Sequence, residues 1–411
     1  MDIRICPGRL SGKVTAPPSK SVAHRMVIAA ALAPGRSEIE GLAPSDDIKA
    51  TMNAMAALGA DIKYDQDRCR AVIEGIKTIP DSAVIDCCES GSTLRFLIPV
   101  AAALGTTATF LGRGKLPQRP ITPYLQEFPA HGVSFDYNYT MPFTVKGRLR
   151  GGKFRIGGDI SSQFITGLLF ALPMLEEDSE IVLTSRLESR PYVDITVGVL
   201  RESGCIIEET ENGYMVGGRQ VFWPKNGKVE GDHSQGAFFE VANAIGSEVK
   251  IEGLNVNSFQ GDKKVIEICK EMVYNKDGLL KPFTADVSDI PDLVPVLAVL
   301  ACYCNGVSRL TNAARLRLKE SDRLAAMEED LNKLGGRVTS DKDSLTIDGR
   351  GGLAGGAEVS AFGDHRIAMA MAIAATGCEK PVTVLGAECV AKSYPDFWEV
   401  FSSLGGRAEK V

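Results

Sequence analysis

The 411-residue chain has little histidine, only two tryptophans and no excess of basic residues. Its four histidines lie far apart in the sequence, so they do not suggest a histidine-rich metal site. The net charge of −6 does not favour a nucleic-acid partner. No apolar run reaches membrane-spanning length, and the first residues, M-D-I-R-I-C, lack an apolar signal core. These absences predict a cytoplasmic protein that does not contact a membrane.

Cysteine is present but shows no pattern of metal binding or redox activity. The ten cysteines are scattered and form no C-x-x-C pair. In a long chain without a secretory signal, we expect them to be reduced and largely structural. We therefore expect no dedicated metal. The composition, 44% hydrophobic and 24% charged, is typical of a globular enzyme, and the length suggests two or three domains.

A polar start followed by an apolar helix rich in small residues occurs six times. Marker residues of successive copies lie 57 to 73 residues apart. Such self-similarity indicates a copied supersecondary unit, here a small layer of helix and strand. Three copies precede residue 230 and three follow it, so we place a domain boundary near 230 and the other crossing near Pro17. The copies are Ser19 to Ala33, Glu89 to Gly105, Ser161 to Leu175, His233 to Gly246, Ile290 to Gly306 and Asp364 to Gly377.

A second type of helix lies between these copies and ends in glycine before a strand-like run. This pattern predicts that each of these helices ends near its glycine. Met272 stands where a sixth such end is expected, without the glycine. The glycine ends are expected at Gly59, Gly132, Gly204, Gly335 and Gly405.

The stretch from Pro18 to Gly35 is the first candidate anion site. Two prolines favour an extended entry, so Ser19 or Ser21 can cap the helix that follows. Lys20 and Arg25 would then lie near the positive end of the helix dipole, an arrangement that binds anions. A capped core helix with two solvated charges also fits this stretch.

Basic residues recur at the starts of other elements. Each occurrence alone could be an ordinary cap or a solvated surface. In an acidic chain, however, their concentration at element starts favours a substrate with several negative charges. The basic residues concerned are Lys20, Arg25, Arg119, Lys319, Arg323, Arg366 and Lys392.

A carboxylate is also expected at a helix start. Asp292 lies on the first turn of the apolar helix that runs to Tyr303, where the helix dipole stabilises its charged form. This residue can be a helix cap or a general base. A second helix is expected to begin at Ser321-Asp322, which places Lys319 and Glu320 in the loop before it.

Nine motifs occur in order along almost the whole chain, and with them the sequence resembles the 5-enolpyruvylshikimate-3-phosphate synthase family. The resemblance implies an α/β protein with the enolpyruvyl transferase fold, a two-domain inside-out α/β barrel with three repeats per domain. The implied domains are 19–230 and 1–18 plus 231–411, with the active site in the cleft between them. The motifs are P-S-K-S-V-A-H-R, E-S-G-S-T-L-R, Q-R-P-I, S-S-Q-F, S-R-P-Y-V-D, I-P-D, L-K-E-S-D-R, G-D-H-R-I-A-M and A-K-S-Y-P-D-F.

The family reaction transfers the enolpyruvyl group of phosphoenolpyruvate to the 5-hydroxyl of shikimate 3-phosphate and releases phosphate. It passes through a tetrahedral ketal, belongs to the shikimate pathway that leads to chorismate and aromatic amino acids, and uses no cofactor. The resemblance implies that Asp292 accepts the hydroxyl proton and that Lys20 and Glu320 move the methylene proton. We expect a monomer that binds these two small molecules.

The resemblance also implies the residues that contact each substrate. For phosphoenolpyruvate they are Lys20, Gly91, Arg119, Gln163, Arg323, Arg366 and Lys392. For shikimate 3-phosphate they are Lys20, Ser21, Arg25, Ser161, Ser162, Gln163, Ser189, Tyr192, Asp292, Arg315 and Lys319.

Two positions depart from the family pattern. Glu89 and Arg315 each stand where many relatives carry asparagine, so the orientation of Glu89 near an anionic substrate and the phosphate contact of Arg315 are open. Gly91 is kept, which implies competition by glyphosate with phosphoenolpyruvate.

Two other functions differ from this one in the residues that they require. An enolpyruvyl transferase acting on UDP-N-acetylglucosamine has a reactive cysteine in the loop before its R-P, whereas Arg113 to Arg119 contains none. A non-catalytic anion-binding protein would have no use for Asp292 and Glu320, because carboxylates repel an anion unless they move protons.

Overall fold

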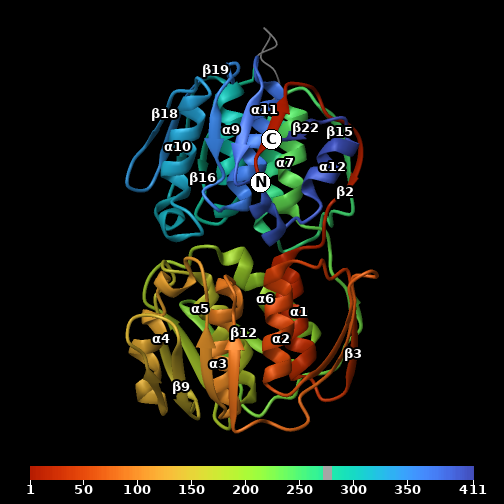
Figure 1. Cartoon of the computed structure of the whole chain (residues 1–411). Coiled ribbons are helices and arrows are strands. Elements are labelled where there is room, and N and C mark those ends of the chain that lie inside the picture. The colour runs from red at the N-terminus through yellow and green to blue at the C-terminus, as the bar shows by residue number, and fades with distance from the viewer. Residues whose placement is uncertain (272–279) are drawn as a thin grey trace. The chain divides into compact units, whose positions relative to one another are not determined.

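The computed structural model describes residues 1–271 and 280–411. By contacts between Cα atoms the chain forms two compact units, which we treat separately (Figure 1). Unit 1 consists of Met1–Pro17 together with Gly231–Val411, and unit 2 is Pro18–Glu230. In sequence, unit 2 is therefore an insertion into unit 1.

Unit 2 contains three repeats, in which two helices alternate with strands. The first has α1 (Lys20–Leu32), β3 (Arg36–Glu40), α2 (Asp46–Ala57), β4 (Asp61–Asp65), β5 (Arg70–Glu74) and β14 (Gly227–Lys228). The second has β6 (Ser82–Asp86), α3 (Gly91–Leu104), β7 (Thr107–Leu111), η1 (Leu116–Gln118), α4 (Thr122–Glu127), η2 (Phe128–His131), β8 (Val133–Asp136) and β9 (Phe143–Gly147). The third has β10 (Gly152–Ile156), α5 (Ser162–Ala171), η3 (Leu172–Met174), β11 (Ser179–Leu183), α6 (Arg190–Glu202), β12 (Ile207–Thr210) and β13 (Gly213–Val216).

Unit 1 repeats the same plan. Its first repeat has β2 (Ser11–Thr15), α7 (His233–Ala244), β15 (Glu248–Glu252), η4 (Gly261–Lys263) and α8 (Lys264–Glu271). Its second has β16 (Thr284–Asp286), η5 (Pro291–Leu293), α9 (Val294–Tyr303), β17 (Asn305–Thr311), η6 (Ala314–Leu318), α10 (Arg323–Lys333), β18 (Val338–Ser340) and β19 (Leu345–Arg350). Its third has β20 (Glu358–Ser360), α11 (His365–Gly377), β21 (Val382–Leu385), η7 (Ala387–Lys392), α12 (Phe397–Ser403), β22 (Arg407–Lys410) and β1 (Ile3–Cys6).

Each repeat carries its own sheet. Five of the sheets in the described residues have four strands, for example β6-β7-β9-β8 and β16-β17-β19-β18, and the sheet β15-β2 has two. In the four-stranded sheets the first two strands are parallel, and a buried helix connects them in four of the five. The remaining strands pair antiparallel, as β7 does with β9 and β9 with β8. The parallel step explains why the long helix is needed, because a hairpin cannot join parallel strands.

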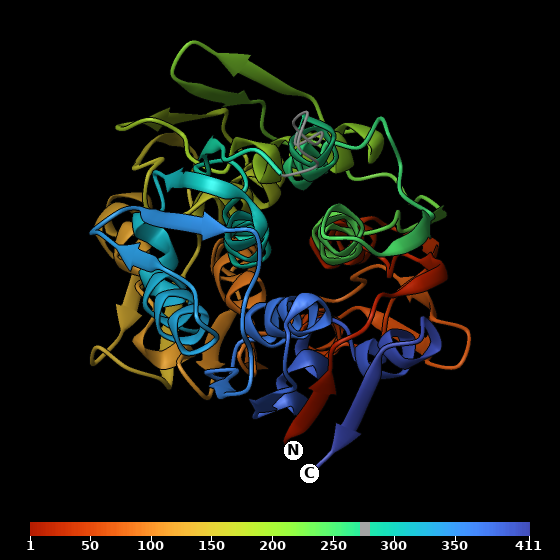
Figure 2. The same ribbon diagram turned by 90° about the horizontal axis from the view of Figure 1, so that it is seen from above.

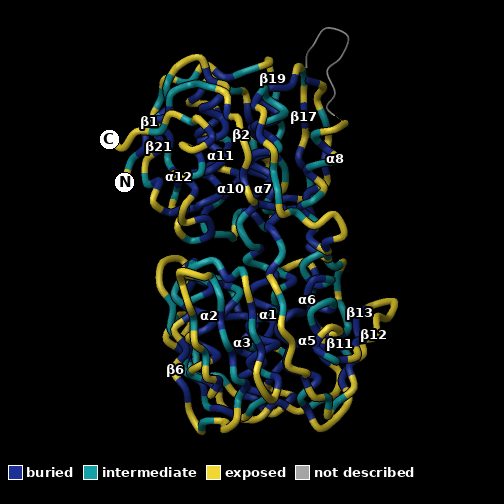
Figure 3. The backbone as a smooth tube through the Cα atoms, turned by 90° about the vertical axis from the view of Figure 1, so that its right-hand side faces the viewer, coloured by how far each residue is buried: buried dark blue, intermediate teal, exposed yellow. Residues whose placement is uncertain are grey.

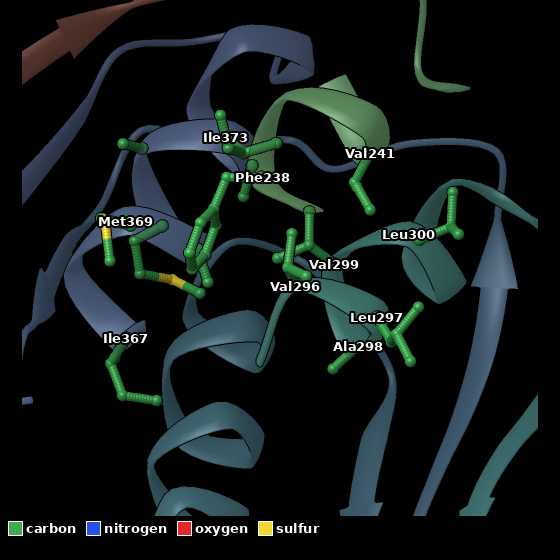
Figure 4. Packing of buried hydrophobic residues seen from close by; sticks show 14 of the residues in the cluster. Phe238, Val241, Val296, Leu297, Ala298, Val299, Leu300, Ile367, Met369 and Ile373 are labelled. Carbon is green, nitrogen blue, oxygen red and sulfur yellow. The ribbon is translucent and has the colours of Figure 1, made fainter. Parts of the chain in front are cut away.

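The connecting helices are buried and the sheets form the outer layer, which is the inside-out arrangement expected from the sequence. Every residue of α9 is buried, as are all residues of α11 except Gly377. Figure 4 shows the packing of α7, α9 and α11 through Phe238, Val296 and Ile373. In Figure 2, α7 (green) and α11 (blue) lie inside the red and blue strands of unit 1. Figure 3 shows the same contrast, with dark blue buried helices and yellow outer loops.

Small residues and glycine determine where these helices can pack and end. Alanine fills much of α1 and α11, which keeps side chains short where buried helices meet. The five glycines expected at helix ends all have positive φ, from 82° at Gly204 to 107° at Gly59. That prediction is confirmed; the one at Met272 lies outside the described residues.

One local expectation was met only in part. Ser19 stands at the N-cap position of α1, but its side chain makes no capping bond. The helix after Ser189 begins at Arg190, and Pro191 is favourable in its first turn. Among the described residues, no helix is both long and apolar enough to cross a bilayer.

Candidate active site

In unit 2, the buried guanidinium of Arg25 joins three helices. Its Nη1 donates to the carbonyl of Ser21 at 2.6 Å, within α1. Its Nε donates to Thr196 Oγ1 at 2.7 Å and its Nη2 to the carbonyl of Tyr192 at 2.8 Å, both in α6. Thr166 of α5 accepts a longer bond of 3.4 Å. Burial lowers the pKa of Arg25 to about 9, so it stays charged at neutral pH.

Lys20, the first residue of α1, binds the carboxylate of Asp47 in α2. The distance from Nζ to Oδ2 is 2.8 Å, and both side chains are less than one fifth exposed. Partial burial makes this ion pair stronger than one on the surface. It holds the ammonium group at the N-terminal end of α1.

Gln163 connects the starts of α3 and α5. Its Oε1 accepts a bond of 2.7 Å from Arg95 Nη1, and its Nε2 donates to Ser92 Oγ at 3.0 Å. Gly91 lies beside this group, and a Cβ built on it would be 2.7 Å from Nη1 of Arg119 and 3.6 Å from Oε1 of Gln163. The expected Gly91, Arg119 and Gln163 are therefore brought together, and a Cβ at position 91 would require the guanidinium of Arg119 to shift.

Serines occupy the starts of α5 and α6. Ser161 caps α5, accepting a bond from the backbone N–H of Gln163 at 3.3 Å, and Ser162 is buried. Ser189, at the N-cap position of α6, is buried and has φ of 56°. A left-handed serine costs of order 1 kcal/mol or more, and such strain clusters at functional sites.

In unit 1, Asp292 lies between two arginines. Its Oδ1 is 2.9 Å from Nη1 of Arg323, and its Oδ2 is 2.8 Å from Nη2 of Arg366. Lys319 Nζ lies 4.0 Å from Oδ1. Burial alone would raise the pKa of Asp292, but Arg366, Lys319 and Arg323 outweigh it and hold that pKa well below its ordinary value. The carboxylate is therefore ionised at neutral pH.

Arg323 is 1% exposed and bound by carboxylates on every side. Besides Asp292, it contacts Asp364 (Nε to Oδ2, 2.8 Å) and Glu320 (Nη2 to Oε2, 3.1 Å). Burial would lower the pKa of Arg323, but Asp364, Glu320 and Asp292 together raise it. Asp364 also caps α11, accepting a bond from the backbone N–H of Arg366 at 3.0 Å.

Unit 1 holds three further basic residues that were expected to bind a substrate. Burial lowers the pKa of Lys319 to about 8, against the opposing effect of Asp292. Arg315 donates to the carbonyl of Ser288 at 2.7 Å. Lys392 donates to the carbonyl of Gly363, the residue before Asp364, at 3.0 Å.

Sequence reasoning missed several residues that build these groups. Asp364 and Ser234 hold the two arginines, since Ser234 Oγ accepts a bond of 3.0 Å from Arg366 Nη2. Asp47 does the same for Lys20. Asp364 could have been found, because it lies two residues before Arg366 in G-D-H-R. Nothing in the sequence pairs Asp47 with Lys20.

Comparison with known proteins gives one consistent family. The model of EPSP synthase (3-phosphoshikimate 1-carboxyvinyltransferase) matches residues 6–401. A 3-phosphoshikimate 1-carboxyvinyltransferase of Clostridium perfringens is 45% identical, and one of Clostridium beijerinckii is 43% identical, with 98% of both chains covered in each case.

Solved structures agree with this result. EPSP synthase from Acinetobacter baumannii superposes with a TM-score of 0.83 at 27% identity, with both chains covered completely. The enolpyruvyl transferase NikO from Streptomyces tendae has a TM-score of 0.79 at 19% identity over 99% of this chain and 98% of its own, a likeness of fold. With a family model that spans nearly its whole length and relatives above 40% identity, the chain belongs to the EPSP synthase family of enzymes.

Proposed function

We propose that this chain transfers the enolpyruvyl group of phosphoenolpyruvate to the 5-hydroxyl of shikimate 3-phosphate, as in aromatic amino-acid biosynthesis. The observation that carries the proposal is the position of Asp292, an ionised carboxylate in contact with Arg323 and Arg366. A protein that only binds anions gains nothing from a carboxylate there. An enzyme that must remove a proton beside an anion needs one.

The basic residues bind the negatively charged groups of the two substrates. Phosphoenolpyruvate contacts Lys20, Gly91, Arg119, Gln163, Arg323, Arg366 and Lys392. Shikimate 3-phosphate contacts Lys20, Ser21, Arg25, Ser161, Ser162, Gln163, Ser189, Tyr192, Asp292, Arg315 and Lys319. Forked guanidinium groups suit the carboxylates and phosphates of both molecules.

The chemistry follows in two stages. The 5-hydroxyl oxygen attacks C2 of phosphoenolpyruvate and gives its proton to Asp292, while the methylene carbon gains a proton and becomes a methyl group. The resulting ketal then loses phosphate and one methyl proton, which leaves the enol ether. Lys20 and Glu320 move the proton at the methylene carbon. Buried cations stabilise the charge that develops on the phosphate.

The reaction balances between two substrates and two products with no change of oxidation state that needs an outside oxidant or reductant, and we propose that it uses no cofactor. The partners are these small molecules, and we propose that the enzyme acts as a cytoplasmic monomer. Sedimentation equilibrium at micromolar concentration tests the oligomeric state, and a mass near twice 44.0 kDa would contradict it.

Phosphate release tests the function directly. Purified protein is given phosphoenolpyruvate with shikimate 3-phosphate, each alone, and phosphoenolpyruvate with UDP-N-acetylglucosamine. Release only with the first pair supports the proposal. Release with the sugar nucleotide, or no release with any pair, contradicts it.

A further inference from the structure

A chain of buried polar side chains connects α1, α2 and α3 in unit 2. His24 Nδ1 lies 2.7 Å from Thr51 Oγ1, which lies 2.7 Å from Thr93 Oγ1. Thr93 Oγ1 in turn donates to Ser90 Oγ at 2.7 Å. None of the four residues is more than 1% exposed. The chain ends at the residue before Gly91.

The direction of these bonds follows from proton counting. Each hydroxyl has a single proton. Thr93 gives its proton to Ser90, so Thr51 must be the donor to Thr93, and His24 Nδ1–H must be the donor to Thr51. Burial lowers the pKa of His24 to about 3, so the ring is neutral and Nε2 carries no proton. Nε2 has no hydrogen-bond partner among the described residues, which an acceptor tolerates better than a donor would.

We propose that His24 is a positioning residue, which acts through Thr51 and Thr93 to hold Ser90 and the N-terminus of α3 in the geometry that phosphoenolpyruvate requires. Ser90 Oγ is the N-cap of α3 and also accepts a bond from the backbone N–H of Thr93 at 3.1 Å. If His24 no longer donates, Thr51 is free to accept from Thr93. The single proton of Thr93 then leaves Ser90, and the cap keeps only one of its two bonds.

Gly91 connects a change in the Ser90 cap to the residues expected to bind phosphoenolpyruvate. Its Cα lies against the guanidinium of Arg119, where a Cβ would come within 2.7 Å. A small shift of the Ser90 cap therefore changes how closely the α3 backbone and Arg119 approach a common anion. Arg25, one residue after His24, is held independently by Thr196 and Tyr192. Loss of the hydrogen bond donated by His24 should thus weaken the binding of phosphoenolpyruvate more than the binding of shikimate 3-phosphate.

The test compares variants that differ in one donor. His24→Asn keeps an N–H near the position of Nδ1, whereas His24→Leu removes it at similar volume. Thr51→Val removes, with almost no change of shape, the hydroxyl that would compete with Ser90 for the proton of Thr93. Thr106→Val is the matched control, because Thr106 is buried beyond the other end of α3 and donates to the carbonyl of Pro80.

The first readout is hydrogen exchange at the backbone amide of Thr93, which needs no enzymatic activity. We expect it to be about fivefold faster in His24→Leu, as for the loss of one neutral hydrogen bond, and unchanged in His24→Asn and Thr106→Val. It should also be unchanged in Thr51→Val, because without the Thr51 hydroxyl the proton of Thr93 keeps Ser90 as its acceptor. Equal exchange in His24→Leu and wild type overturns the proposal. Equal acceleration in His24→Asn and His24→Leu also overturns it, because the donor would not matter.

The second readout rests on the proposed function. We expect His24→Leu to raise KM for phosphoenolpyruvate about fivefold with KM for shikimate 3-phosphate within twofold, and His24→Asn to restore the wild-type value. In the Thr51→Val background, His24→Leu should add little, since both act through one chain. A parallel rise of both KM values contradicts the proposal. An inactive wild type would reject the proposed function, while the exchange result would still decide the role of His24.

Discussion

Asp292 and Arg366 bind each other at 2.8 Å although 74 residues separate them in the sequence. The expected proton acceptor thus neutralises one of the arginines expected to bind phosphoenolpyruvate. An anion that binds Arg366 competes with Asp292 for the same guanidinium. When that anion binds, Asp292 loses a stabilising contact and its pKa rises toward the range of a useful base.

Substitution Asp292→Asn separates these two roles. We expect kcat to fall by about 10²- to 10⁴-fold, the usual contribution of a general base, while KM for phosphoenolpyruvate does not rise. Phosphate-release kinetics measure both constants. The control is Asp396→Asn, which changes an exposed carboxylate of the same unit and should leave both constants within twofold. An unchanged kcat with a raised KM would show that Asp292 only orders the arginines.

Substitution Gly91→Ala should weaken inhibition by glyphosate. We expect glyphosate to compete with phosphoenolpyruvate in the wild type, and the added methyl group, 2.7 Å from Arg119 Nη1, to narrow the space that both molecules use. The inhibition constant should rise at least tenfold, with a smaller rise in KM for phosphoenolpyruvate. Gly352→Ala is the control, because a Cβ there meets nothing within 4 Å. Equal inhibition constants would remove Gly91 from the site.

Substitution Arg25→Lys should weaken the binding of shikimate 3-phosphate. A lysine cannot replace a fork that binds Thr196, Ser21 and Tyr192 at once. We expect KM for shikimate 3-phosphate to rise more than tenfold and the melting temperature to fall by several degrees. Arg201→Lys, an exposed change on α6, should alter neither. A normal KM with a lowered melting temperature would assign Arg25 a purely structural role.

Asp330 should make the protein less stable as pH rises from about 4 to 6. Burial raises the pKa of this carboxyl from 3.8 to about 6, so the folded state binds a proton that the unfolded state has lost. Ionising Asp330 in the fold then costs about 3 kcal/mol above pH 6, at 1.36 kcal/mol for each pKa unit. Asp330→Asn should remove this slope and stabilise the protein at pH 7.

Urea unfolding at pH 4.5 and 7 measures the effect of Asp330. The control Asp343→Asn alters an exposed carboxylate in a turn and should keep the wild-type slope. If Asp330→Asn and wild type lose stability equally between the two pH values, the carboxyl does not titrate in this range.

The repeats and the apolar helices could be predicted because they depend on local pattern. Small residues at short spacing mark α3, α9 and α11, and glycine marks helix ends such as Gly59 and Gly405. Asp292, Arg323 and Arg366 are found in first turns as expected, whereas Arg119 and Lys319 follow η1 and η6, and Lys392 ends η7. The sequence therefore predicted the fold class and the family.

Pairings between distant residues could not be predicted. That Asp364 binds the side chain of Arg323 depends on two repeats packing together. The failure of Ser19 to cap α1 and the left-handed backbone of Ser189 are likewise decided by tertiary contacts, which override local preference. One sequence alone gives no signal for either.

The strand β1 lies between β21 and β22, with Ile3 opposite both Val384 and Lys410. Strand β1 is therefore synthesised nearly four hundred residues before both of its partner strands are available. Residues 18–230 carry a complete set of their own sheets and can fold in the meantime. Biosynthesis thus makes the inserted unit first, and the unit that holds Asp292, Arg323 and Arg366 is completed only when translation reaches β22.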